Sequence, residues 1–226
     1  MIKAVIFDFD GTLSNRMKNA YEVFRDYFRP FFKDMNEMEY EAVLQDMMYF
    51  DCNGIIDVDV RLIPFFRKYG SYLPSDFEEK FVPFYYENMY TYTMLREETI
   101  EVLENLKKKY KLAILSNGDS SSQHNKIKKV NIEGYFDEVI VSGDLGIHKP
   151  DARIFDIMAK RLGVKNEECL MIGDVFATDI LGAYRANMTP VWVVSDPLRP
   201  AESYKGYRIE DLRGIYPILE ELNKAA

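Results

Sequence analysis

The spacing of apolar and polar positions changes twice along the chain. Residues 4–9 form a short apolar run that is rich in β-forming side chains and ends at an Asp-Gly turn, which predicts a buried strand. Between about residues 15 and 93 the apolar positions recur at helical spacing. From about residue 97 onward, helix-like and strand-like segments alternate. The pattern therefore predicts an α/β fold interrupted, after its first strand, by a helical insertion.

The insertion, residues 15–93, has the signals of an all-helical unit. One apolar stripe consists of Met17, Tyr21, Phe24, Phe28 and Phe31. Capping patterns of an Asn or Ser followed three residues later by Glu occur at Asn36 with Glu39 and at Ser75 with Glu78. These signals predict about four helices, and the chain is expected to leave the sheet region near Ser14 and to return near Met94.

The alternating region predicts a parallel sheet that is covered by helices on both faces. After the first strand, the expected strands are residues 111–115, 138–141, 169–172 and 190–194. The expected helices are residues 97–109, 123–130, 151–162, 177–186 and 212–222. The predicted organisation is thus a sheet domain of residues 1–14 and 94–226 and a helical domain of residues 15–93.

Composition and charge narrow the classes of function. Hydrophobic residues make up 47% of the 226-residue chain and charged residues 29%, which is typical of a globular protein. No apolar run approaches the roughly 18 residues of a membrane span, and the N-terminal segment lacks the pattern of a secretory leader. We therefore expect a cytoplasmic protein with no membrane partner. A net charge of −8 argues against binding of nucleic-acid polymers, although one small anion could bind where a metal and a lysine make the site locally positive.

Polar residues follow several of the predicted strands, where ligands bind in open parallel sheets. The first strand ends in the segment DFDGT, which contains Asp8, Asp10 and Thr12. The strand at 111–115 is followed by Ser116 and Asn117, and Lys149 stands before a proline and a helix. The strand at 169–172 runs into GDVFATD, which contains Asp174 and Asp179.

These segments, in this order, resemble the motifs of the haloacid dehalogenase superfamily of phosphatases, and the likeness extends over the whole sheet region. The helical block stands where that family inserts a helical cap, between its first and second motifs. The resemblance implies a Rossmann-like core, a Mg²⁺ cofactor and an aspartyl-phosphate intermediate. It also implies a small phosphorylated metabolite as the substrate.

The residue types fit that chemistry. A phosphate monoester and an attacking carboxylate are both anions, so the site needs positive charge. Asp8 is the expected nucleophile and Asp10 the expected general acid and base. Lys149 supplies a fixed positive charge that can bridge Asp8 and the phosphoryl oxygens. Asp8 and Asp174 offer carboxylates to Mg²⁺, which prefers oxygen ligands.

The resemblance completes the expected site. It adds the backbone carbonyl of Asp10 as a third metal ligand. We expect Ser116, Asn117 and Thr12, with Lys149, to contact the phosphoryl group. We expect Asp179 to orient metal-bound water or Lys149 rather than to bind the ion itself.

Each segment also has a structural interpretation when it is considered alone. Asp10-Gly11 and Ser116-Asn117-Gly118 are ordinary turn sequences, and a single lysine is usually a solvated charge. Asp174 and Asp179 could be N-caps of the helix that follows. The functional interpretation rests on all of them occurring together, in order, at strand ends.

The sequence leaves open which reaction of this superfamily the protein catalyses and which substrate it uses. Asp10 argues against dehalogenation, and Gly173 stands where sugar-phosphate mutases such as β-phosphoglucomutase usually have Glu. A phosphonatase would need a cap lysine, for which the candidates are Lys18, Lys33, Lys68 and Lys80.

A nucleoside monophosphate is the leading substrate expectation, because the segment 116–155 resembles the nucleotidase branch and the insertion is rich in aromatic residues that could stack on a base. Phosphoglycolate and sugar phosphates are the alternatives, and a non-catalytic binding module is the competing class.

Overall fold

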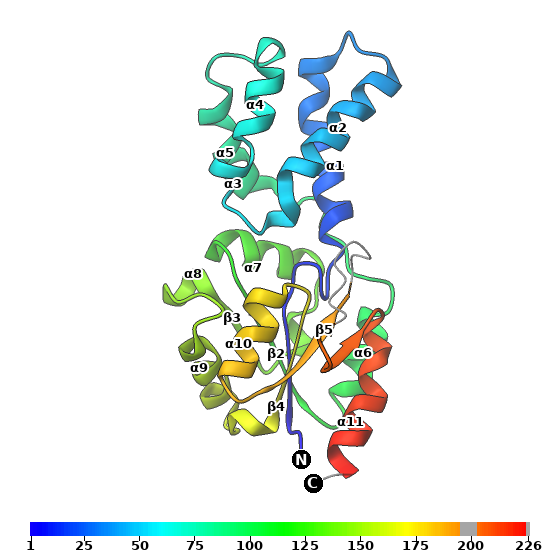
Figure 1. The fold of residues 1–226 in the computed structure, drawn as a ribbon, viewed down its shortest axis with the longest axis vertical. Coiled ribbons are helices and arrows are strands. Elements are labelled where there is room, and N and C mark those ends of the chain that lie inside the picture. The colour runs from blue at the N-terminus through cyan, green and yellow to red at the C-terminus, as the bar shows by residue number, and fades with distance from the viewer. Residues whose placement is uncertain (195–202, 225–226) are drawn as a thin grey trace. The chain divides into compact units, whose positions relative to one another are not determined.

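The computed structural model describes residues 1–194 and 203–224 and divides the chain into two compact units (Figure 1). The first unit consists of Met1–Asn15 and Leu95–Ala226, and the second of Arg16–Met94. The second unit is therefore an insertion into the first, placed shortly after the first strand.

The first unit is built on a parallel sheet, which in the described part of the chain has six strands in the order β3-β2-β1-β4-β5-β6. The strands are β1 Ala4–Phe7, β2 Lys111–Ser116, β3 Glu138–Val141, β4 Cys169–Gly173, β5 Thr189–Val193 and β6 Tyr207–Ile209. All neighbouring strands pair in parallel, so the predicted α/β fold class is confirmed. The three-residue strand β6 was not predicted.

Helices cover both faces of this sheet, as the buried strands require. The helices are α6 Thr99–Leu106, α7 Ser120–Lys129, α8 Ser142–Leu145, α9 Ala152–Leu162, α10 Leu181–Arg185 and α11 Ile215–Lys224. Alternate side chains of β1 enter two separate cores: Val5 and Phe7 pack with α6, α7 and α11, whereas Ala4 and Ile6 pack with α9 and α10. The result is a three-layer arrangement in which all four residues of β1 are buried.

The two helices of this unit that lie next to the candidate site begin differently from the prediction. The helix expected at residue 123 starts at Ser120, because the Asp119 side chain accepts a hydrogen bond from the Ser122 N–H and caps the helix there. The helix expected over 177–186 begins as a π-helical turn, Phe176–Ile180, before α10. Both differences lie next to the candidate site, where the backbone departs from regular geometry.

The second unit is all helical, with α1 Arg16–Phe28, α2 Glu37–Asp51, α3 Val58–Arg61, α4 Ile63–Tyr69 and α5 Phe77–Asn88. The capping box predicted at Asn36 is confirmed, since Asn36 and Glu39 each accept a hydrogen bond from the other's backbone N–H. The box predicted at Ser75 is wrong. Because α5 starts at Phe77, Glu78 is its second residue, whereas the box needs a Glu or Gln at the third.

Aromatic side chains fill the core of the helical unit. Phe24, Phe28, Phe65 and Phe81 are completely buried, and the rings of Phe28 and Phe65 lie 5.0 Å apart. A buried ion pair joins Arg16 Nη1 to Asp51 Oδ2 at 2.6 Å in the same unit. Much of the aromatic content that motivated the nucleotide expectation therefore stabilises the helical unit itself. None of the described helices is both long and apolar enough to cross a bilayer.

Candidate active site

Strand register brings the predicted motifs to one edge of the sheet. Phe7 of β1 pairs with Ile114 of β2 on one side and with Ile172 of β4 on the other. Asp8, Ser116 and Asp174 all follow these paired positions within two residues, at the carboxyl ends of their strands. The chain continues from β1 to β2 on one side and later reaches β4 on the other, so this edge is the topological switch point where such sheets bind ligands.

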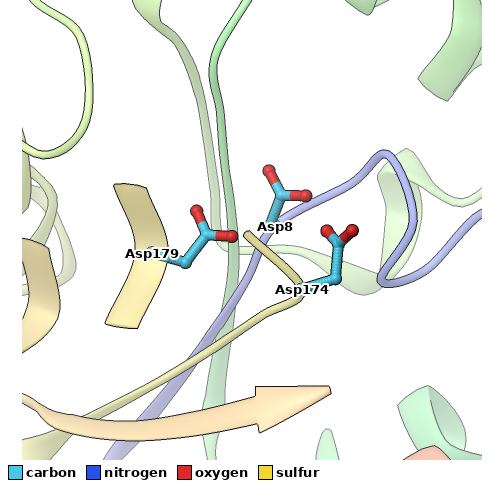
Figure 2. A group of neighbouring side chains, drawn as sticks. All are labelled: Asp8, Asp174 and Asp179. Atoms are coloured by element: carbon cyan, nitrogen blue, oxygen red, sulfur yellow. The ribbon is translucent and has the colours of Figure 1, made fainter. Parts of the chain in front are cut away.

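Three aspartates converge at this edge (Figure 2). Asp8 follows β1, Asp174 follows β4 and Asp179 lies in the π-helical turn, and their side chains point toward one another. One carboxylate oxygen from each lies within 4.8 Å of the others, and all three residues are buried. Gathering buried carboxylates is costly without compensating positive charge, so the arrangement suits a hard divalent cation together with a lysine.

Gly11 makes room for this arrangement. Its φ is +84°, and a Cβ at this position would lie 2.5 Å from Oδ2 of Asp174. A side chain would therefore be both strained and in collision with the carboxylate. The carboxylate oxygens and the space that a glycine keeps beside them fit a metal ion.

Lys149 supplies the compensating charge. Its Nζ lies 2.7 Å from Asp8 Oδ1 and 2.7 Å from Asp179 Oδ1, and it also donates to the Leu115 carbonyl at 2.7 Å. Burial acts to lower the pKa of Lys149, but attraction to Asp179 and Asp8 outweighs it and raises that pKa above its ordinary value. Lys149 is therefore an ammonium ion fixed beside the expected nucleophile.

The expected nucleophile lies in a desolvated position. Burial raises the pKa of Asp8 above its ordinary value, and the positive charge of Lys149 opposes that rise. A carboxylate that is stripped of water but held by an ammonium group is poorly screened. It is therefore sensitive to any cation or phosphoryl group that enters the site.

Both carboxylate oxygens of Asp179 contact hydrogen-bond donors of the protein itself. Its Oδ1 pairs with Lys149, and its Oδ2 accepts the Val175 N–H at 2.9 Å. Gly173 permits this packing, because a Cβ there would lie 2.3 Å from the Asp179 side chain. These contacts favour the expected role of Asp179 in orienting Lys149, which stays a prediction.

The expected phosphate-binding residues lie at the same edge. Asn117 donates from Nδ2 to the Lys149 carbonyl at 2.9 Å and accepts the Lys149 N–H on Oδ1 at 2.9 Å, so its amide is aligned with the Lys149 backbone. The Thr12 hydroxyl faces Asp174 Oδ1 at 3.4 Å, and Ser116 is buried at the end of β2. Their contact with a phosphoryl group stays a prediction.

Asp10 is held by residues that the sequence analysis missed. Its Oδ2 accepts from Lys126 Nζ at 2.6 Å and from Gln123 Nε2 at 2.8 Å, while the Ser14 hydroxyl lies 3.4 Å from Oδ1. The available signal was that Gln123 and Lys126 are polar residues on the same helical face as Ile127. Helical spacing alone does not show that these side chains reach Asp10, which lies 113 and 116 positions away in the sequence.

Trp192 is a second residue that the motifs did not indicate. Its indole N–H donates to the backbone carbonyl of Asp174 at 2.9 Å, from the neighbouring strand β5. It is the one tryptophan of the chain. Its fluorescence should therefore report on changes at Asp174.

Comparisons with known proteins identify the family. Residues 2–187 match the family described as haloacid dehalogenase-like hydrolase. A glyceraldehyde 3-phosphate phosphatase of Methanopyrus kandleri is 30% identical over 236 residues, covering 99% of this chain and 100% of the relative. An N-acylneuraminate-9-phosphatase of Homo sapiens is 36% identical over 48% of this chain and 44% of its own.

Solved structures agree on the fold. A putative hydrolase of the same superfamily from Bacillus subtilis, bound to magnesium, superposes with a TM-score of 0.78 at 21% identity, over 96% of this chain and 98% of that one. The matched residues 2–187 include every site residue described above except Trp192. The chain therefore belongs to the haloacid dehalogenase-like hydrolase family, and the two relatives named above are phosphatases.

Proposed function

We propose that this protein is a Mg²⁺-dependent phosphatase that hydrolyses a small phosphate monoester through an aspartyl-phosphate on Asp8. The observation that carries the proposal is the buried group at the switch point, in which Asp8 lies 2.7 Å from Lys149 and within reach of Asp174. The names of the relatives support phosphatase chemistry.

The chain's own residues account for both halves of the reaction. Asp8 attacks phosphorus and a P–O bond forms, while the ester P–O bond breaks and the leaving oxygen takes a proton from Asp10. Water then attacks the aspartyl-phosphate, and Asp10 takes a proton from that water as phosphate departs. Lys149 stabilises negative charge on the phosphoryl oxygens in both steps.

The metal would be held by the carboxylates of Asp8 and Asp174, with the backbone carbonyl of Asp10 as the third protein ligand that the family resemblance implies. When bound, Mg²⁺ would supply positive charge that offsets the repulsion between the carboxylate and the phosphate ester. The magnesium in the structurally similar Bacillus subtilis protein supports this choice of ion. Asp179 would remain outside the coordination sphere, since Lys149 and Val175 already occupy its oxygens.

The proposed metal ligands predict that turnover depends on Mg²⁺ and that variants of the aspartates differ in Mg²⁺ affinity. EDTA should abolish turnover and Mg²⁺ should restore it, whereas Ca²⁺ should not, because its longer bonds and higher coordination number would misplace Asp8. Asp174→Ala should weaken Mg²⁺ binding far more than Asp179→Ala does. Binding is measured directly, without substrate, by titrating Mg²⁺ against Trp192 fluorescence. A larger loss of affinity in Asp179→Ala would reverse the proposed roles of the two residues.

For the substrate we propose a phosphate ester of a primary alcohol. The relatives named above are a glyceraldehyde 3-phosphate phosphatase and an N-acylneuraminate-9-phosphatase, and a further relative is a phosphoserine phosphatase. In each named compound the phosphate is carried by a primary alcohol. A CH₂ group next to the ester oxygen is slender, which suits a nucleophile that is only 6% exposed. We propose that the helical unit, residues 15–93, serves as the cap that selects among such esters.

A matched pair of substrates tests this class. Glycerol 3-phosphate and glycerol 2-phosphate have the same composition and charge but differ in whether the esterified carbon is primary or secondary. The primary ester should have a kcat/KM about tenfold or more higher, the effect of small steric differences at a tight site. Equal values would refute the primary-alcohol class while leaving the phosphatase proposal standing.

The same assay should include sugar phosphates, phosphoglycolate, phosphoserine and nucleoside 5′-monophosphates. We expect a three-carbon or sugar phosphate to exceed the nucleotides. The reason is that five phenylalanine rings of the cap are fully buried in its core rather than available for stacking on a base, namely Phe24, Phe28, Phe32, Phe65 and Phe81. A nucleotide preference of tenfold or more would restore the nucleotidase expectation.

A further inference from the structure

We propose that Gln123 and Lys126, which belong to none of the motifs described above, are positioning residues that hold the side chain of Asp10 for proton transfer. This inference rests on the proposed function, in which Asp10 is the general acid and base. Both residues lie on α7, the helix that follows β2, and both contact the same oxygen of Asp10. They would act on the reaction only through Asp10.

The burial of Lys126 indicates a specific partner. Lys126 is only 5% exposed, whereas Lys128 and Lys129 of the same helix are exposed. Burying an ammonium group without a counter-charge is strongly unfavourable, so such groups are retained where they are paired. The Asp10 carboxylate, 2.6 Å away, is that pair.

The position of Gln123 is equally constrained. Its Nε2 donates to Asp10 Oδ2 at 2.8 Å and lies 3.2 Å from the Asn117 carbonyl, so it joins α7 to the loop that carries the second motif. Gly118 has a φ of +148°, and a Cβ there would lie 2.8 Å from Nε2 of Gln123. A glycine is therefore needed beside Gln123 for it to reach Asp10.

Helix geometry explains why these two residues act together. Positions separated by three residues share a helical face, and Ile127, next to Lys126, is buried in the sheet core. The Asp119 cap fixes the first turn of α7. The two donors are thus attached to a helix that is anchored at its start and along its buried face.

The contacts from α7 restrict the orientation of the Asp10 side chain. Asp10 lies in the loop after β1, where rotation about its side-chain bonds would otherwise allow several orientations. The two short contacts are both to Oδ2, and the Ser14 contact to Oδ1 is longer, at 3.4 Å. The two contacts to Oδ2 therefore fix the orientation of the carboxyl group for proton transfer.

The test compares single variants of α7. Lys126→Met and Gln123→Ala should each lower kcat for glycerol 3-phosphate by up to about 10²-fold, the effect of displacing a catalytic group by about 1 Å. The rate of the p-nitrophenolate burst, which reports phosphorylation of Asp8, should fall much less, because p-nitrophenolate departs without protonation. KM and the Mg²⁺ affinity reported by Trp192 should stay the same. Lys129→Met removes a charge from the same helix and should leave all these values unchanged.

A double-mutant cycle separates this role from direct phosphate binding by Lys126. Asp10→Asn removes proton transfer but leaves an acceptor for Lys126 and Gln123. In that background Lys126→Met should cause no further loss, because the two residues act through one step. Lys126→Arg, which retains a donor, should recover most of the activity. An additive loss in the cycle, or a rise in KM together with an equal loss at the phosphorylation step for both substrates, would overturn the inference.

The outcomes also distinguish this inference from the proposed function. If the wild-type protein fails to hydrolyse either substrate with Mg²⁺, the proposed function itself is wrong. If the wild type is active and Asp10→Asn has the expected leaving-group dependence, but Lys126→Met is additive with it, only the positioning role fails. Melting temperatures show whether Lys126→Met is folded. If it is not, the same measurements on Gln123→Ala test the positioning role.

Discussion

Replacement of Asp8 by asparagine is expected to reduce turnover to the background rate while leaving the protein folded. Asparagine has nearly the same shape but lacks the charge that attacks phosphorus. The fold should tolerate the change, because Lys149 retains Asp179 as a counter-ion at 2.7 Å and is not left as an unpaired buried charge. Steady-state assays with p-nitrophenyl phosphate measure the activity, and thermal melting measures the stability.

Trapping of the intermediate provides the positive evidence for the same step. In an Asp10→Ala background, p-nitrophenyl phosphate should still phosphorylate the enzyme, but the hydrolytic half-reaction should be slow. A phosphoryl group should then accumulate, and mass spectrometry should place it on Asp8. Substantial activity of Asp8→Asn, or a phosphoryl group found on another residue, would contradict the covalent mechanism.

Asp10→Ala is expected to lower kcat for an alkyl phosphate by about 10²- to 10⁴-fold, the usual contribution of a general acid or base. The loss should depend on the leaving group. An alkoxide needs a proton as it departs, whereas p-nitrophenolate does not, so the first half-reaction with p-nitrophenyl phosphate should be nearly unaffected. Stopped-flow kinetics with the two substrates separate the burst of leaving-group release from steady-state turnover.

A burst followed by slow turnover with p-nitrophenyl phosphate would show the acid and base roles separately. The control is Ser14→Ala, which removes only the long 3.4 Å contact to Asp10 and should have a small effect. If the two substrates lose rate to the same degree at the phosphorylation step, then Asp10 is not the acid. The nucleophilic role of Asp8 would be unaffected by that result.

Local sequence signals were sufficient for the architecture. The apolar strands, the capping box at Asn36 and the alternation after residue 97 predicted an α/β fold with a helical insertion, and the parallel sheet confirms the fold class. These signals succeed because hydrophobic periodicity and capping depend on residues within a few positions of each other. The box predicted at Ser75 failed for the same reason: a shift of one residue in the helix start removes Glu78 from the position that the motif requires.

Contacts between segments that are far apart in sequence could not be read in the same way. The motifs placed Asp8 and Lys149 at strand ends, but their 2.7 Å approach depends on strand order and register, which are set by packing across the whole sheet. In the sequence, Lys126 cannot be distinguished from Lys128 and Lys129 of the same polar helix. Only the structure, which buries it beside Asp10 across 116 positions of sequence, distinguishes it from its exposed neighbours.

The division between the two sources of information has a physical basis. The residue types available for the chemistry, and the segments that carry them, could be recognised from the sequence alone, because strands, helices and turns follow from short-range patterns. The tertiary structure decided which side chains meet, since the desolvation that forces Lys149 and Lys126 to pair with Asp8 and Asp10 exists only inside the folded core. That burial gives the aspartates their environment, and no local pattern in the chain encodes it.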